Sequence, residues 1–145
     1  MAQVIAIDAN LLIYAYVESL PQHARAKQWL IETFSSATPV YLPWSSIHAF
    51  LRLTTKPTLF HEPYGSEEAI AIVDSWLARR NVSVLEPGAR YWTILRDLIR
   101  VHDVRGDLMT DAHLAALAIE HEATVYSADK DFARFTGLRV INPLV

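Results

Sequence analysis

The stretch Thr110–Phe132, TDAHLAALAIEHEATVYSADKDF, combines a small-residue helix, a short apolar strand and an acidic turn. Its alanines recur at helical spacing, which predicts a helix over residues 110–121 with a face able to pack closely on a sheet. Ala123–Tyr126 is apolar at nearly every position, as is typical of a strand buried on both faces. Asp129 and Asp131 follow that strand directly. This order indicates an α/β fold with acidic residues at a strand end.

The rest of the chain alternates between short apolar runs and segments with helical periodicity. Five strands are expected, over residues 4–7, 40–42, 82–85, 123–126 and 138–141. Helices are expected over 11–17, 21–34, 47–55, 66–80, 89–101 and 110–121, with a helical turn at 131–135. Strands that alternate with helices form a mainly parallel sheet covered on both faces. The predicted fold is a three-layer α/β/α sandwich, with residues 1–145 as a single domain.

Three finer predictions concern helix starts and an inward face. Ser45 or Ser46 is expected to cap the helix at 47–55, and Ser66 to cap the next one, because a serine hydroxyl can accept from a first-turn N–H. In the helix at 89–101, the spacing of the apolar residues places Trp92 on the buried face.

The composition narrows the possible functions. The 145 residues include no cysteine, which excludes disulfides, thiolate zinc sites and a cysteine nucleophile. A net charge of −3 gives no general attraction for nucleic acid, so a polyanion must be held by a local basic patch or through a metal. No basic leader and no apolar stretch of membrane-spanning length is present. We expect a soluble cytoplasmic protein without membrane contact.

Three aspartates far apart in the sequence are expected to share one site. Asp8 ends the first apolar run, Asp111 opens a helix, and Asp129 follows a strand. Each also has a structural interpretation, as a helix cap, a charge at a helix start, or a turn residue. The carboxyl ends of parallel strands meet at one edge, which favours the shared site. Clustered carboxylates repel unless a cation lies between them, and Mg²⁺ or Mn²⁺ bound there could promote phosphodiester hydrolysis.

These motifs resemble the PIN domain, specifically the VapC-type toxins of bacterial toxin–antitoxin systems. The resemblance rests on Asp8, on the helix that opens at Asp111, and on Ser127-x-Asp129-x-Asp131-Phe132, and it spans nearly the whole chain. It implies a PIN-like sandwich, and an endoribonuclease dependent on Mg²⁺ or Mn²⁺ that cleaves structured RNA (tRNA or rRNA) and inhibits translation. It also implies a homodimer and neutralisation by a VapB-like antitoxin. Catalysis and metal binding carry over to Asp8, Asp111 and Asp129, with Asp131 as an accessory acid and Ser127 as a supporting hydroxyl.

One position departs from the family pattern. Where the family usually places a glutamate, in the helix after the second strand, this chain has Ala49. Asp107 is the first candidate to supply the lost charge and could instead cap a helix, while His48 is a weaker candidate with surface exposure as its alternative. Asn10 could donate its amide near Asp8 or stabilise a turn. If nothing replaces the acid, the chain is a catalytically weakened PIN-like module that binds RNA or antitoxin. A phosphotransfer domain with Asp8 as nucleophile is a third hypothesis.

Several side chains are candidates to hold RNA. Guanidinium groups match phosphate geometry, and solvated surface charge is the alternative for each of Arg79, Arg80, Arg105 and Arg134. Trp44 and Tyr14 could stack on bases, with core packing as the alternative.

Overall fold

Five parallel strands form one sheet in the order β3-β2-β1-β4-β5, in the computed structural model, which describes residues 3–57 and 62–145. The strands are β1 (Ile5–Ile7), β2 (Val40–Pro43), β3 (Val82–Leu85), β4 (Thr124–Tyr126) and β5 (Val140–Ile141). Each pairs in parallel with its neighbours. The predicted class and the predicted number of strands are confirmed.

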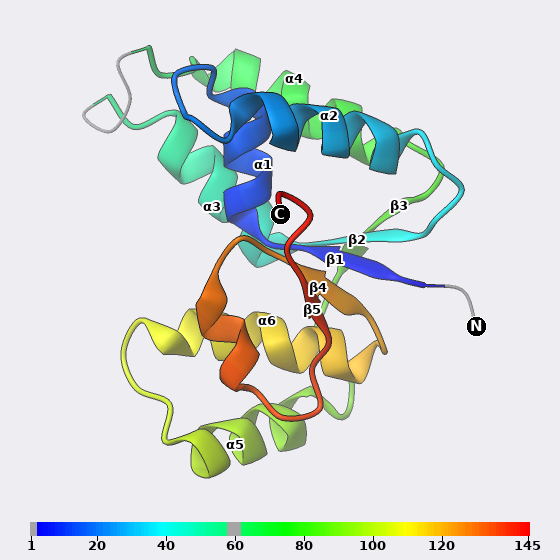
Figure 1. The fold of residues 1–145 in the computed structure, drawn as a ribbon, viewed down its shortest axis with the longest axis vertical. Coiled ribbons are helices and arrows are strands. Elements are labelled where there is room, and N and C mark those ends of the chain that lie inside the picture. The colour runs from blue at the N-terminus through cyan, green and yellow to red at the C-terminus, as the bar shows by residue number, and fades with distance from the viewer. Residues whose placement is uncertain (1–2, 58–61) are drawn as a thin grey trace.

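Helices cover both faces of this sheet (Figure 1). One layer holds α1 (Ala9–Tyr16), α2 (His23–Phe34), α3 (Trp44–Thr54) and α4 (Ser66–Leu77). The other holds α5 (Tyr91–His102), α6 (Leu108–Glu120) and the short 3₁₀ helix η1 (Lys130–Arg134). The predicted three-layer sandwich is therefore confirmed. No helix within the two described ranges is both long and apolar enough to span a membrane.

The central strand β1 separates two buried clusters. Ile5 and Ile7 pack into the cluster formed with α1 to α4, whereas Ala6 belongs to the cluster formed with α5 and α6. The four alanines of α6 are fully buried in that second cluster. Because small residues meet on both sides, α6 can lie close to β1, and its first turn comes near the end of that strand.

The predicted serine caps are wrong. α3 begins at Trp44 with Pro43 as its N-cap and no side-chain cap bond. Proline fixes a backbone φ compatible with the end of β2, so the helix starts one residue before the serines. α4 has Gly65 as its N-cap, because the Glu68 carboxylate accepts the Gly65 N–H at 3.1 Å and satisfies that donor without the Ser66 hydroxyl.

Trp92 was also predicted incorrectly. Its side chain is 60% exposed, while Leu95 and Leu98 form the buried face of α5. Tyr91, the preceding residue, takes the place facing α6 by a hydrogen bond to His113. The apolar spacing alone could not tell which residue of the first turn faces inward.

The strand register determines which loops meet. Ile7 pairs with Tyr126, and the Asp8 N–H donates to the Tyr126 carbonyl at 3.0 Å. Asp8 and Ser127, the next residues along, therefore leave the sheet side by side at its carboxyl edge. α6 runs antiparallel to the strands, so its first turn lies at this same edge (Figure 1).

Candidate metal centre

Asp8 joins the end of β1 to the start of α1. It is the N-cap of α1, and its Oδ1 accepts the Ala9 N–H at 2.8 Å. Its Oδ2 accepts the Ser127 hydroxyl at 2.7 Å. The capping interpretation and the site interpretation are compatible, because one oxygen faces the helix and the other faces the turn after β4.

Ser127 is the centre of a small polar network. Its hydroxyl, fully buried, donates to Asp8 and accepts the backbone N–H of Asp129 at 2.9 Å. The Asn10 amide donates to the same oxygen at 3.3 Å, and the Asn10 Oδ1 accepts the Ala128 N–H at 3.5 Å. These bonds fix α1 against the turn after β4 and hold two of the predicted acids in place.

Asp129 and Asp131 are ordered by that turn. Asp129 is the N-cap of η1, and its Oδ1 accepts the Asp131 N–H at 2.8 Å. The Asp131 carboxylate lies 3.6 Å from Nη2 of Arg134, and the Arg134 Nε donates to the Asp131 carbonyl at 3.3 Å. The turn therefore keeps both carboxylates at the carboxyl edge.

Asp111 completes the group from the first turn of α6. One carboxylate oxygen from each of Asp111, Asp129 and Asp131 lies within 4.8 Å of the others. Asp8 adjoins this group through Ser127. The structure thus brings the three predicted acids to one edge, and it places Asp131, predicted only as an accessory, among the most closely grouped carboxylates.

Two of these carboxyl groups hold their protons more tightly than usual. Burial and, to a lesser extent, the charges of Asp129, Asp8 and Asp131 together raise the pKa of Asp111 to about 6, against an opposing effect of Arg134. Burial also raises the pKa of Asp8, although hydrogen bonds from Ser127 and Ala9 counteract it. Negative charge has gathered here without enough positive charge nearby, as expected where a cation belongs.

The candidates for the missing acid lie elsewhere. Asp107 occupies the N-cap position of α6, is exposed, and makes no side-chain cap bond. His48 is exposed and Ala49 half-buried on α3. Across residues 3–57 and 62–145, the group that could hold a metal includes neither Asp107 nor His48.

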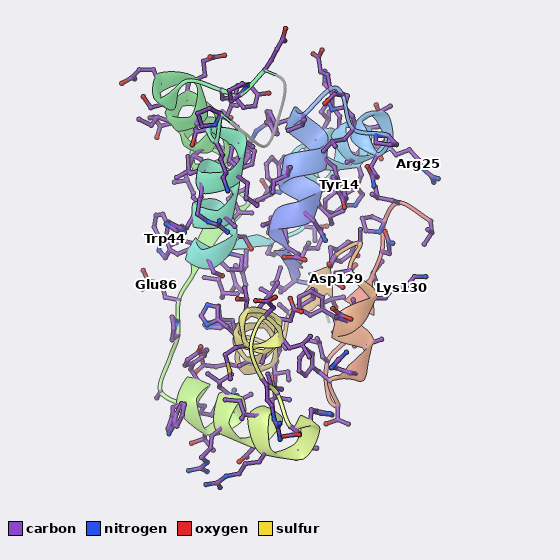
Figure 2. All side chains as sticks on the ribbon, turned by 90° about the vertical axis from the view of Figure 1, so that its left-hand side faces the viewer. Tyr14, Arg25, Trp44, Glu86, Asp129 and Lys130 are labelled. Carbon is purple, nitrogen blue, oxygen red and sulfur yellow. The ribbon has the colours of Figure 1, made fainter. Side chains whose placement is uncertain are left out.

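The four arginines divide between two edges of the sheet. Arg79 and Arg80 lie just before β3, separated from it by Asn81, which puts them at the amino edge of the sheet, away from the acids. Arg105 pairs with Asp103 at 3.0 Å in the loop before α6, and Arg134 pairs with Asp131. Lys130, which was not among the candidates, is exposed and follows Asp129 at the carboxyl edge (Figure 2).

Comparison with known proteins agrees with this fold. A family model described as PIN domain matches residues 5–138. The chain is similar to Ribonuclease VapC33 of Mycobacterium tuberculosis, with 38% identity over 137 residues that cover 94% of this chain and 96% of the relative.

Two solved structures share the architecture at lower identity. VapBC2 from Rickettsia felis, bound to a DNA fragment from its promoter, gives a TM-score of 0.70 at 14% identity, covering 97% of this chain and 98% of the other. VapC20 of M. tuberculosis, a toxin that cleaves the sarcin–ricin loop, gives 0.67 at 20% identity, covering 93% and 98%.

Proposed function

The chain belongs to the PIN-domain family, among its VapC ribonucleases, and on that premise we propose that it is a metal-dependent endoribonuclease acting as a toxin. Residues 1–145 form one PIN-like domain in this proposal. The observation that carries it is the convergence of Asp111, Asp129 and Asp131, from two separate elements, with Asp8 alongside.

The donor set fits a hard divalent cation. Mg²⁺ and Mn²⁺ favour carboxylate oxygens, and ligands about 2.1 Å from one Mg²⁺ lie at most about 4.2 Å apart. Carboxylate oxygens within 4.8 Å of each other need only small movements to reach that range. The raised pKa of Asp111 supports the same assignment, because a bound cation would offset both the burial and the repulsion between carboxylates that raise it.

Each acidic residue has a distinct part in the proposed site. Asp111, Asp129 and Asp131 hold the cation, and Asp8 adds negative charge from a position fixed by Ser127. A cation bound there supplies charge stabilisation for the phosphodiester and a lowered pKa for bound water. Asn10 and Ser127 keep Asp8 and the turn after β4 in register, and Arg134 limits the movement of Asp131.

The substrate and partners follow from the relatives. VapC20 cleaves the sarcin–ricin loop, which supports structured RNA, either rRNA or tRNA, as substrate. The VapBC2 complex supports a VapB-like antitoxin as the neutralising partner. The toxin is a cytoplasmic homodimer in this proposal.

The position of Ala49 bears on the alternative, a weakened binding module. Three carboxylates already converge without any contribution from α3. This convergence favours an active nuclease over a binding module, although α3 contributes no acid at Ala49.

The proposed function is tested by cleavage of total RNA in Mn²⁺. Asp111→Asn and Asp129→Asn each remove a metal ligand, so cleavage should fall about 100-fold or more while the circular dichroism spectrum stays unchanged. Asp97→Asn is the matched control, because Asp97 is an exposed aspartate on α5 outside the group. Undiminished cleavage in both site variants, or full activity in EDTA, would refute the proposal.

A further inference from the structure

Trp44 is an exposed aromatic residue held in one orientation. It opens α3, and its side chain is 47% exposed. The indole Nε1–H donates to Oε1 of Glu86 at 3.2 Å. Core packing, the alternative weighed from the sequence, does not describe this side chain.

The strand register puts Trp44 at the carboxyl edge of the sheet, where the acidic group lies. Pro43 pairs with Leu85, so Trp44 and Glu86 are the first residues beyond β2 and β3. β2 also pairs with β1, and the register Ile5 to Val40, continued, places Pro43 level with Asp8. Neighbouring strands lie about 4.8 Å apart, so the backbone at Trp44 is roughly 10 Å across the edge from the turn after β4. Figure 2 shows Trp44 and Glu86 on one side of Asp129 and Lys130 on the other.

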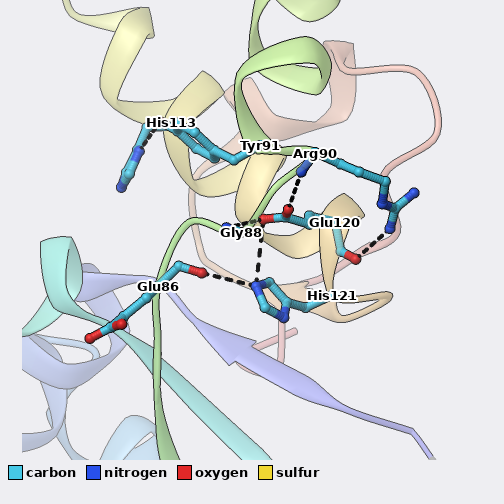
Figure 3. A network of polar contacts seen from close by, with 7 residues as sticks. All are labelled: Glu86, Gly88, Arg90, Tyr91, His113, Glu120 and His121. Atoms are coloured by element: carbon cyan, nitrogen blue, oxygen red, sulfur yellow. Dashed lines mark hydrogen bonds and ion pairs between the residues drawn. The ribbon is translucent and has the colours of Figure 1, made fainter.

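Glu86 is itself anchored. Its carbonyl oxygen is 3.0 Å from Nε2 of His121, the residue that follows α6. Just before it, the Glu120 carboxylate accepts the N–H groups of Gly88 and Arg90 at 2.8 and 2.9 Å (Figure 3). The segment 86–90 is therefore fixed to the end of α6, and Glu86 is fixed with it. A side chain ordered in advance loses little entropy when a ligand packs on it.

We propose that Trp44 is a stacking platform for an unpaired base of the RNA, next to the phosphodiester that the metal centre cleaves. The proposal rests on the proposed ribonuclease function. Every base has a π-face, so an exposed indole can stack on it without sequence preference. The Glu86 carboxylate repels phosphate, which directs the sugar–phosphate backbone away from Trp44 and toward the cation held by the acidic group. Glu86 is a positioning residue, because it acts through the indole.

The test measures RNA binding in the Asp129→Asn background, which prevents cleavage. The probes are a fluorescein-labelled single-stranded RNA octamer and an abasic octamer with the same backbone, at fixed salt and Mn²⁺. Trp44→Leu should weaken binding of the base-bearing octamer roughly 10- to 100-fold and leave the abasic octamer unchanged. Trp44→Tyr should retain most of the affinity.

Two further variants separate stacking from general effects. Trp92→Leu is the matched control, since Trp92 is 60% exposed on α5, and it should not change the affinity. Glu86→Ala should weaken binding less than Trp44→Leu does. Glu86→Gln should bind the octamer about as tightly as the parent protein, because the glutamine amide oxygen still accepts the indole N–H.

The outcomes distinguish the two proposals. Equal affinity of Trp44→Leu and its parent, equal losses on both octamers, or no binding by the parent protein would each overturn the platform. If Trp44→Leu leaves RNA binding intact but changes self-association in sedimentation, Trp44 contacts protein and the platform is again wrong. The ribonuclease assignment is judged separately, by the dependence of total-RNA cleavage on Asp111 and Asp129.

Discussion

The two ends of α6 carry carboxylates whose surroundings have opposite effects. At the first turn, burial and neighbouring acids raise the pKa of Asp111 to about 6. At the last residue, burial opposes ionisation of Glu120, but N–H donors from Gly88 and Arg90 outweigh it and lower the pKa. The helix macrodipole alone favours the reverse, since it stabilises negative charge at a helix N-terminus and disfavours it at the C-terminus. Local contacts therefore override the dipole at both ends.

The different surroundings distinguish Asp111, a candidate metal ligand, from Glu120, whose carboxylate has a structural role. Glu120 has its hydrogen-bond partners within the protein and serves to attach the segment 86–90 to α6. Asp111 is surrounded by acids, with Arg134 as the opposing cation. A carboxylate left short of positive partners is available to an external cation, whereas a satisfied one is not.

The largest expected contrast is the response to Mn²⁺. A cation that binds only the folded protein stabilises it by about 2.7 kcal/mol at one hundred times its Kd. Titration with MnCl₂ in thermal unfolding should therefore raise the Tm of the wild type and of Glu120→Gln by similar amounts. Asp111→Asn should show little or no rise. An equal Mn²⁺ shift in Asp111→Asn would place the cation elsewhere.

A smaller contrast is expected in the pH dependence of stability without metal. The folded pKa of Asp111 is raised from 3.8 to about 6, so ionisation costs stability, and the folded protein becomes less stable as pH rises between those values. Asp111→Asn removes this effect, and its Tm should exceed that of the wild type above about pH 6 and converge with it near pH 4.

Glu120 should give the opposite slope. Its folded pKa is lowered from 4.5, so its contribution is present above that value and is lost as pH falls through the folded pKa. Glu120→Gln should therefore lie below the wild type at neutral pH and approach it in acid. The two variants are compared with the wild type in EDTA over the same pH range. If the Tm difference from the wild type changes with pH in the same direction for both, the contrast between the ends of α6 is contradicted.

The sequence predicted the sandwich because its signals are local. Apolar runs such as Val4–Ile7 and the helical spacing of the alanines of α6 can each be recognised within a few residues. The shared edge of Asp8, Asp111 and Asp129 followed from the rule that parallel strands end together. These inferences needed no knowledge of side-chain contacts.

Other features depended on contacts between distant segments. The sequence ranked Asp107 as the acid to join the site and Asp131 only as an accessory, but the turn into η1 groups Asp131, and not Asp107, with Asp111 and Asp129. The hydrogen bond from Trp44 to Glu86 joins residues 42 apart, and it depends on the pairing of β2 with β3. The Glu120 contacts likewise require that the segment 86–90 pass the end of α6.

The smallest expected effect tests the C-terminal end of α6, where the Glu120 carboxylate has its hydrogen-bond partners within the protein. A Cβ added at Gly88 would lie 2.7 Å from Oε2 of Glu120, so Gly88→Ala must displace the carboxylate from its N–H donors. We expect a Tm lowered by a few degrees, with Mn²⁺ stabilisation retained because the acidic end is untouched. In a Glu120→Ala background the clash disappears, and Gly88→Ala should become neutral or slightly stabilising, because alanine reduces the entropy of the unfolded chain. The same loss of Tm in both backgrounds would show that Gly88 is required for a reason other than its approach to Glu120.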